Sequence, residues 1–273
     1  MKAYVIPQGS FFGDKFMKVL ATVVMMTLPF IAMMGATQAG EKSERVYEMR
    51  TYYSPEGRLD DLHARFRNHT VKLFEKHGMT NIGYWTPIDN KENKLVYILA
   101  YPSRDAAKKS WAAFGADPAW QAVRKETEAK GKIVAKVESL FLKATDYSPE
   151  PKPATTGDRV FELRTYIATP KNLDNLNARF RNHTVKLFEK HGMTNIGYWV
   201  PLKGEKGADD TLVYFLSHKS VEAAKKSFGA FRDDPAWKAA FKASEEKAGG
   251  PLTMPKIGVK SIMMKATDYS PIR

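Results

Sequence analysis

The sequence predicts an α+β fold built from two tandem ferredoxin-like units, each with the element order β-α-β-β-α-β. The first observation is a duplication, because ARFRNHTVKLFEKHGMTNIGYW occurs unchanged at Ala64–Trp85 and at Ala178–Trp199. The second is the alternation of side chains before and after this stretch, and the third is the helical spacing of apolar residues inside it. A chain of 273 residues therefore divides into two halves of ordinary domain size.

The first strand and helix of each half follow from local patterns. Arg45–Tyr52 alternates two sets of side chains and is rich in β-branched and aromatic residues, which is typical of a strand. A helix is expected from about Leu59 to Lys76, and Gly78 suits its C-terminal cap. Its predicted inner stripe is spaced by four, three and four residues: Leu62, Phe66, His69 and Leu73.

The remaining elements of the first half can be predicted in the same way. Met79–Thr86 predicts the second strand, and the nearly wholly apolar Leu95–Tyr101 predicts a central third strand. Residues 103–131 are expected to be helical, with a break near Asp117, which can cap a new helix. Ile133–Ala144 supplies the last strand.

The boundaries of the units follow from the repeat and from one Pro-rich segment. Residues 148–157 (SPEPKPATTG) are polar and Pro-rich, so they are expected to form a linker. We therefore expect a first unit at residues 40–147 and a second at 158–273. Both units end in the same sequence, KATDYSP.

The N-terminal region predicts an export signal. An apolar run at residues 19–36 follows Lys18, and small residues precede Gly40, which predicts a signal peptide at 1–39 cleaved after Ala39. Met17 is an alternative start, and an uncleaved membrane anchor is the alternative interpretation. We expect an exported protein, periplasmic or secreted, that is not an integral membrane protein after cleavage.

Composition excludes several classes of site. The chain has no cysteine, so disulfides, Cys-ligated metals and a thiol nucleophile are excluded. No HxH or HExxH pattern occurs, and the sequence predicts no metal and no cofactor. The net charge is +13, but basic and acidic residues are interspersed and no nucleic-acid-binding signature accompanies them. We therefore expect a solvated basic surface and no nucleic acid partner.

The motifs, in order, resemble one known family. YEMRTY at 47–52 and FELRTY at 161–166 are each followed by FEKHG, GYW, an LVY strand and DPAW. This set resembles the NIPSNAP family, and the resemblance covers both halves. It implies the dimeric α/β-barrel superfamily fold, with the barrel closed inside one chain. The protein would then be a monomeric pseudo-dimer, with further association into a homo-oligomer left open. The resemblance implies little about chemistry, because the family's activity is poorly defined.

Two histidines are the candidate catalytic residues. His69 and His183 fall on the predicted inner stripe of their helices, where a histidine can act as general base or metal ligand. The alternative is a core histidine that hydrogen-bonds to a neighbouring strand. The sequence does not decide whether the protein is an enzyme.

The candidate ligand-binding residues lie on the predicted strands. Arg50 beside Glu48, and Arg164 beside Glu162, could face the barrel and bind a carboxylate or phosphate; the alternative is an ion pair within each strand. Four tyrosines could line a ligand cavity: Tyr52, Tyr84, Tyr166 and Tyr198. The sequence thus favours a protein that binds a small anionic or aromatic ligand in the barrel. The alternative is a non-catalytic module that binds a protein or an envelope surface.

Overall fold

The computed structural model describes residues 45–155 and 157–273, which belong to one compact unit. The predicted signal peptide, its cleavage site and the alternative start at Met17 lie outside these ranges. Within them, no helix combines the length and the apolar character needed to cross a membrane.

Eight strands form a closed antiparallel barrel, with the strand order β1-β3-β2-β8-β5-β7-β6-β4. Both repeats contribute four strands, so the expected closure within one chain is confirmed. The strands of the first repeat are β1 Val46–Tyr53, β2 Thr80–Pro87, β3 Lys94–Tyr101 and β4 Lys136–Ala144. Those of the second are β5 Val160–Ile167, β6 Thr194–Pro201, β7 Thr211–His218 and β8 Val259–Ala266.

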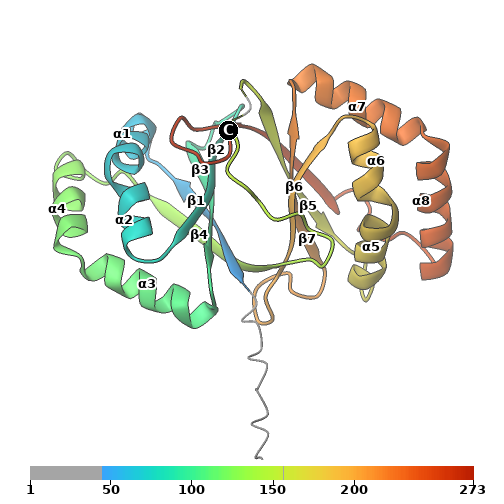
Figure 1. Cartoon of the computed structure of the whole chain (residues 1–273), viewed down its shortest axis with the longest axis horizontal. Coiled ribbons are helices and arrows are strands. Elements are labelled where there is room, and N and C mark those ends of the chain that lie inside the picture. The colour runs from blue at the N-terminus through green and yellow to red at the C-terminus, as the bar shows by residue number, and fades with distance from the viewer. Residues whose placement is uncertain (1–44, 156) are drawn as a thin grey trace, which may run out of the picture. The chain divides into compact units, whose positions relative to one another are not determined.

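Each repeat places its helices on the outer face of its own strands, so the barrel lies between two helical layers (Figure 1). The first layer contains α1 Leu59–Arg65, the π-helical η1 Phe66–Thr70, α2 Val71–Lys76, α3 Arg104–Ala116 and α4 Pro118–Thr127. The second contains α5 Leu173–Arg179, η2 Phe180–Thr184, α6 Val185–Lys190, α7 Val221–Asp233 and α8 Pro235–Ala248.

The two repeats exchange their C-terminal tails, while the last strand of each stays in its own sheet and also pairs with the other repeat. β4 pairs with β6 of the second repeat, and β8 pairs with β2 of the first. Beyond β8, the backbone N–H of Thr267 donates to the carbonyl of Tyr84 at 2.9 Å, and Asp268 forms a bidentate pair with Arg67 at 2.6 and 2.8 Å. The segment after β4 repeats these contacts on the second repeat. This exchange explains why both units end in KATDYSP.

A π-helical turn changes which side chains the long helix buries. The backbone N–H of Val71 donates to the carbonyl of Phe66, five residues earlier, which inserts one extra residue into the turn. The buried stripe is therefore Leu62, Phe66, Thr70 and Phe74. The predicted inner position of His69 is wrong, because His69 is half-buried and its copy His183 is exposed.

Side chains fill the interior of the barrel. Trp85 and Trp199 are fully buried there, and each indole ring folds back over the glycine two residues earlier. A Cβ atom on Gly83 would lie 2.3 Å from Trp85 Cη2, and one on Gly197 would lie 2.2 Å from Trp199 Cη2. The GYW motif is thus a packing unit of the barrel core, and a ligand cavity has to be sought outside it.

Candidate functional site

The polar face of β1 points toward the helices instead of into the barrel. Arg50 Nη1 donates to Glu48 Oε1 at 2.5 Å, and the guanidinium lies 4.2 Å from the centroid of Trp111 in α3. Glu48 is 1% exposed and also accepts hydrogen bonds from Tyr101 and Trp111, at 2.8 and 2.7 Å. The barrel-facing prediction for Arg50 is therefore wrong, and the ion pair within the strand is what the structure contains.

The second repeat builds the same carboxylate site from different partners. Arg164 Nη1 donates to Glu162 Oε1 at 2.5 Å, so the barrel-facing prediction for Arg164 is also wrong. His218 Nε2 lies 3.0 Å from Glu162 Oε2, where the first repeat uses a tyrosine and a tryptophan. Burial raises the pKa of Glu162, but the hydrogen bond from His218 and the charge of Arg164 outweigh it and hold the pKa below its usual value.

Two of the four predicted tyrosines belong to the packed core. Tyr84 and Tyr198 are fully buried, and their hydroxyls donate to Asn81 and Asn195 in the same strands. Burial raises the pKa of both phenols well above the usual value. Tyr166 accepts a hydrogen bond from Arg164 Nη2 at 3.2 Å. These hydrogen bonds all lie within single strands, and of the four predicted tyrosines Tyr52 is the one that lines the pocket described next.

That pocket lies between α1–η1, α4 and the outer face of β1 and β4, with a volume of about 270 Å³. Aromatic rings form much of its wall, and charged side chains surround its mouth. Its lining residues are Tyr52, Arg65, Phe66, Thr70, Phe74, Phe114, Trp120, Arg124, Glu128, Lys132, Val134 and Val137.

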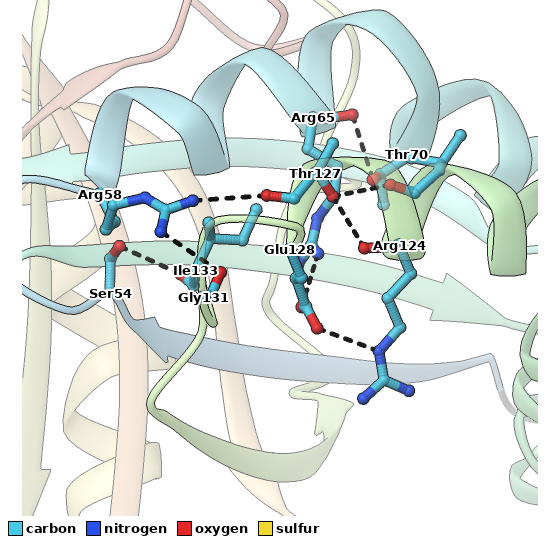
Figure 2. Close-up of polar contacts among 10 residues, drawn as sticks. Ser54, Arg58, Arg65, Thr70, Arg124, Thr127, Glu128, Gly131 and Ile133 are labelled. Atoms are coloured by element: carbon cyan, nitrogen blue, oxygen red, sulfur yellow. Dashed lines mark hydrogen bonds and ion pairs between the residues drawn. The ribbon is translucent and has the colours of Figure 1, made fainter.

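Arg65 is the central polar group of the pocket. Its side chain is 3% exposed, and Nη1 donates to Glu128 Oε1 at 3.0 Å (Figure 2). The guanidinium lies 5.1 Å from the centroid of Trp120, within cation–π range, while the buried Nε has no hydrogen-bond partner. A buried donor without an acceptor is costly, so this N–H favours an acceptor supplied from outside the chain.

Glu128 is shared between two arginines. Arg124 Nε donates to its Oε2 at 3.3 Å, from the solvent side of α4 (Figure 2). Burial raises the pKa of Glu128, but the hydrogen bonds from Arg65 and Arg124 outweigh it and keep the pKa below its usual value. Glu128 is therefore charged at neutral pH and balances one of the two guanidinium groups.

Arg58 fixes the far wall of the pocket. Its guanidinium donates to the carbonyl oxygens of Thr127, the last residue of α4, and of Gly131, four residues later (Figure 2). It also donates to the carbonyl oxygen of Lys130. Because the last carbonyls of a helix have no partner within it, the contact with Thr127 caps the C-terminus of α4, and Arg58 ties this end to the start of α1. The wall that carries Arg124 and Glu128 is thus held in place from outside the pocket.

His69 contributes to a neighbouring hollow, with Arg58, Asn68 and Glu126, instead of to the pocket of Tyr52. The structure therefore does not bring His69 together with Arg50, Tyr52 or Tyr84, and its catalytic role stays a prediction. No group of three potential metal-ligating side chains occurs in the part of the chain that the structure describes.

The fold and this pocket define a class of protein: two ferredoxin-like repeats closed into an α/β barrel, with a cationic, aromatic-lined pocket under one helical layer. The NIPSNAP family model matches residues 47–149 and 161–249, which together are most of the described chain. The protein belongs to the NIPSNAP family. No match was found among curated proteins.

Solved structures share the barrel at low sequence identity. A candidate monooxygenase from Fusobacterium nucleatum superposes with a TM-score of 0.54 at 13% identity, covering 82% of this chain and 93% of its own. An anthrone oxidase-like protein gives a TM-score of 0.51 at 13% identity, covering 85% and 94%. A NIPSNAP domain protein from Burkholderia xenovorans is 23% identical, with a TM-score of 0.34, and covers 38% of this chain and 99% of its own. At these identities the first two likenesses concern the fold alone.

Proposed function

We propose that this protein binds a small anionic molecule with a flat apolar body, in the pocket of the first repeat. The observation that carries the proposal is Arg65, a buried arginine whose Nε–H lacks a partner inside an aromatic-lined pocket. A carboxylate is the acceptor that best matches the planar donor set of a guanidinium.

The charge around the pocket supports an anion. Arg65, Arg124 and Lys132 line it together with a single carboxylate, Glu128, which leaves a positive excess. The exposed Arg124 and Lys132 would attract an anion from solvent, while Arg65 would hold it in a site of low dielectric constant.

The walls support a flat apolar body. Tyr52, Phe66 and Trp120 all line the pocket, and aromatic side chains favour stacked or edge-on contacts with another ring. The volume of about 270 Å³ lies near the lower end of the range of small-molecule sites, about 300–1,000 Å³. The candidate ligand is therefore a small aromatic acid instead of a large cofactor.

We assign no reaction. Two structural neighbours are named as a candidate monooxygenase and as an anthrone oxidase-like protein, which makes a flat aromatic substrate worth testing. The signal-peptide pattern at residues 1–39 supports the further proposal that binding takes place outside the cytoplasm. The interaction-module hypothesis stays a prediction.

The test compares two probes with the same rings and different charge. Titration with 1-naphthoate is expected to quench tryptophan fluorescence saturably and to raise the melting temperature, because a ligand that binds only the folded state stabilises it. 1-Naphthalenemethanol is expected to bind at least about tenfold more weakly, since it lacks the charge that Arg65 would pair. Absence of saturable binding by both probes, or equal binding, would contradict the proposal.

A further inference from the structure

The second repeat carries Phe241 where the first carries Arg124. The two residues correspond because α4 and α8 begin with the same Asp-Pro-Ala-Trp, at 117–120 and 234–237. Glu128 and Glu245 correspond by the same register. The buried arginine is also present in both halves, as Arg65 and Arg179, so the two half-sites differ mainly at their mouths.

The ring of Phe241 lies against the buried arginine of its repeat. The guanidinium carbon of Arg179 is 5.0 Å from the centroid of Phe241 and 5.4 Å from that of Trp237. The two rings also contact each other, at 5.6 Å between centroids. In the first repeat the corresponding positions are Trp120 and Arg124. The guanidinium of Arg65 stacks on Trp120, whereas the side chain of Arg124 extends toward solvent.

We propose that Phe241 fills, in the second repeat, the volume that the ligand occupies in the first, so that the duplicated chain has one binding site. Residue 124/241 then determines which repeat binds. This inference rests on the proposed function of the first pocket, and it adds that the second repeat has become the structural partner of the first.

Charge at the two mouths supports the same assignment. Arg124 and Lys132 line the first pocket, whereas α8 presents Phe241 and is followed by Gly249, Gly250 and Pro251. Burial lowers the pKa of Arg179, and the nearest carboxylate oxygen, on Glu245, lies 3.7 Å from its Nη1. Arg179 Nε lacks a hydrogen-bond partner, as Arg65 Nε does. The half-sites therefore differ in the second ring, that of Phe241, which covers the guanidinium of Arg179.

Phe241 is also 40% exposed, which is unusual for a phenylalanine that serves only the core. A ring that closes the mouth of a pocket is expected to have one face buried against the arginine and the other in solvent. The exposed fraction of Phe241 therefore agrees with a side chain that covers the mouth of this half-site.

The first experiment locates the ligand in the intact protein. The chain has five tryptophans, so ¹⁵N labelling of tryptophan gives five indole N–H signals, and Trp120→Phe and Trp237→Phe assign the two of interest. Titration with 1-naphthoate is expected to shift the Trp120 signal to saturation and leave the Trp237 signal in place. Equal saturable shifts of both signals would overturn the one-site inference and leave the proposed function standing. No saturable shift of Trp120 would overturn both.

The second experiment exchanges the residues at the mouth. Arg124→Phe is expected to weaken 1-naphthoate binding about tenfold or more, since a charged contact is lost and a ring enters the pocket. Phe241→Arg is expected to produce a saturable shift at Trp237. Phe241→Ala removes the same ring without adding a charge. It replaces Phe241→Arg in this experiment if the arginine variant does not fold. A folded variant with five dispersed indole signals that gains no binding at Trp237 would overturn the role of Phe241.

Discussion

His77 Nε2 lies 2.7 Å from Asp117 Oδ2, and in the second repeat His191 Nε2 lies 2.8 Å from Asp234 Oδ2. Each aspartate also caps the N-terminus of the helix that follows it, by accepting from the N–H two residues later. The pair therefore joins the end of one helix to the start of another, which explains why FEKHG and DPAW occur together in both halves.

The first prediction concerns pH. Hydrogen bonds from Lys76 and His77 and from the backbone of residue 119 hold the pKa of Asp117 well below its usual range. Because the pKa is lower in the folded state, these hydrogen bonds to the Asp117 carboxylate stabilise the fold. Their contribution is complete above the unfolded-state pKa of about 3.9 and is lost as the pH falls below it. Asp117→Asn is expected to lower the urea midpoint at pH 7, and the difference from the native protein should shrink between pH 4 and pH 2.5. A difference that is constant over this range would contradict the linkage.

The second prediction concerns the GYW motif. Gly83→Ala places a methyl group against Trp85 and is expected to reduce the free energy of unfolding by about 1–3 kcal/mol, since the ring cannot retreat within a filled barrel. Gly115→Ala is the matched control, because a Cβ at that helical position meets no atom within 4 Å. It is expected to be neutral or to stabilise by up to about 1 kcal/mol. Denaturant unfolding of both variants checks the contrast, and equal losses would contradict the packing argument.

The third prediction separates the two components of the exchanged tail. Tyr269 packs on Phe66 and Tyr84 with ring centroids 6.2 and 5.3 Å apart, so Tyr269→Ala is expected to cost about 3 kcal/mol. The neighbouring pair of Asp268 and Arg67 is largely exposed, so Asp268→Asn is expected to cost less than about 1 kcal/mol. If urea unfolding shows a larger loss of stability for Asp268→Asn than for Tyr269→Ala, the ion pair and not the ring holds the tail on the other repeat.

Much of the fold could be predicted because the repeat and the strand patterns are local features. The α+β class, the strand and helix order and the family resemblance agree with the structure. The inner stripe of the long helix could not be predicted, because the π-turn at η1 shifts every later side chain and hydrophobic spacing alone does not reveal it. The face of β1 also depends on tertiary packing, since Glu48 and Arg50 are polar yet face the helices.

The pocket residues other than Tyr52 could not be predicted, for a related reason. Arg65 lies between Leu62 and Phe66 on the buried side of its helix, but a charged residue is not expected there from pattern alone. Its recurrence as Arg179 inside the unchanged block was the available signal. Glu128 and Arg124, by contrast, lie on a helix that differs between the repeats, and only the structure brings them to Arg65.

The last prediction follows from the position of Glu128. In the free protein its carboxylate accepts a hydrogen bond from the guanidinium of Arg65. A ligand carboxylate therefore has to compete with Glu128 for this guanidinium. Glu128→Gln keeps the side chain's shape, removes the competing charge and is expected to bind 1-naphthoate about three- to tenfold more tightly.

The same variant should be less stable in the absence of ligand, because Arg65 then loses the charge that balances it in a buried site. Glu126→Gln is the matched control, since it removes an exposed carboxylate from the same helix without touching Arg65. Calorimetric titration and urea unfolding of both variants give the two quantities. Tighter binding together with lower stability, for Glu128→Gln and not for Glu126→Gln, would show that the Glu128 carboxylate and the ligand compete for Arg65. Weaker binding would show instead that Glu128 orients Arg65 for binding the ligand.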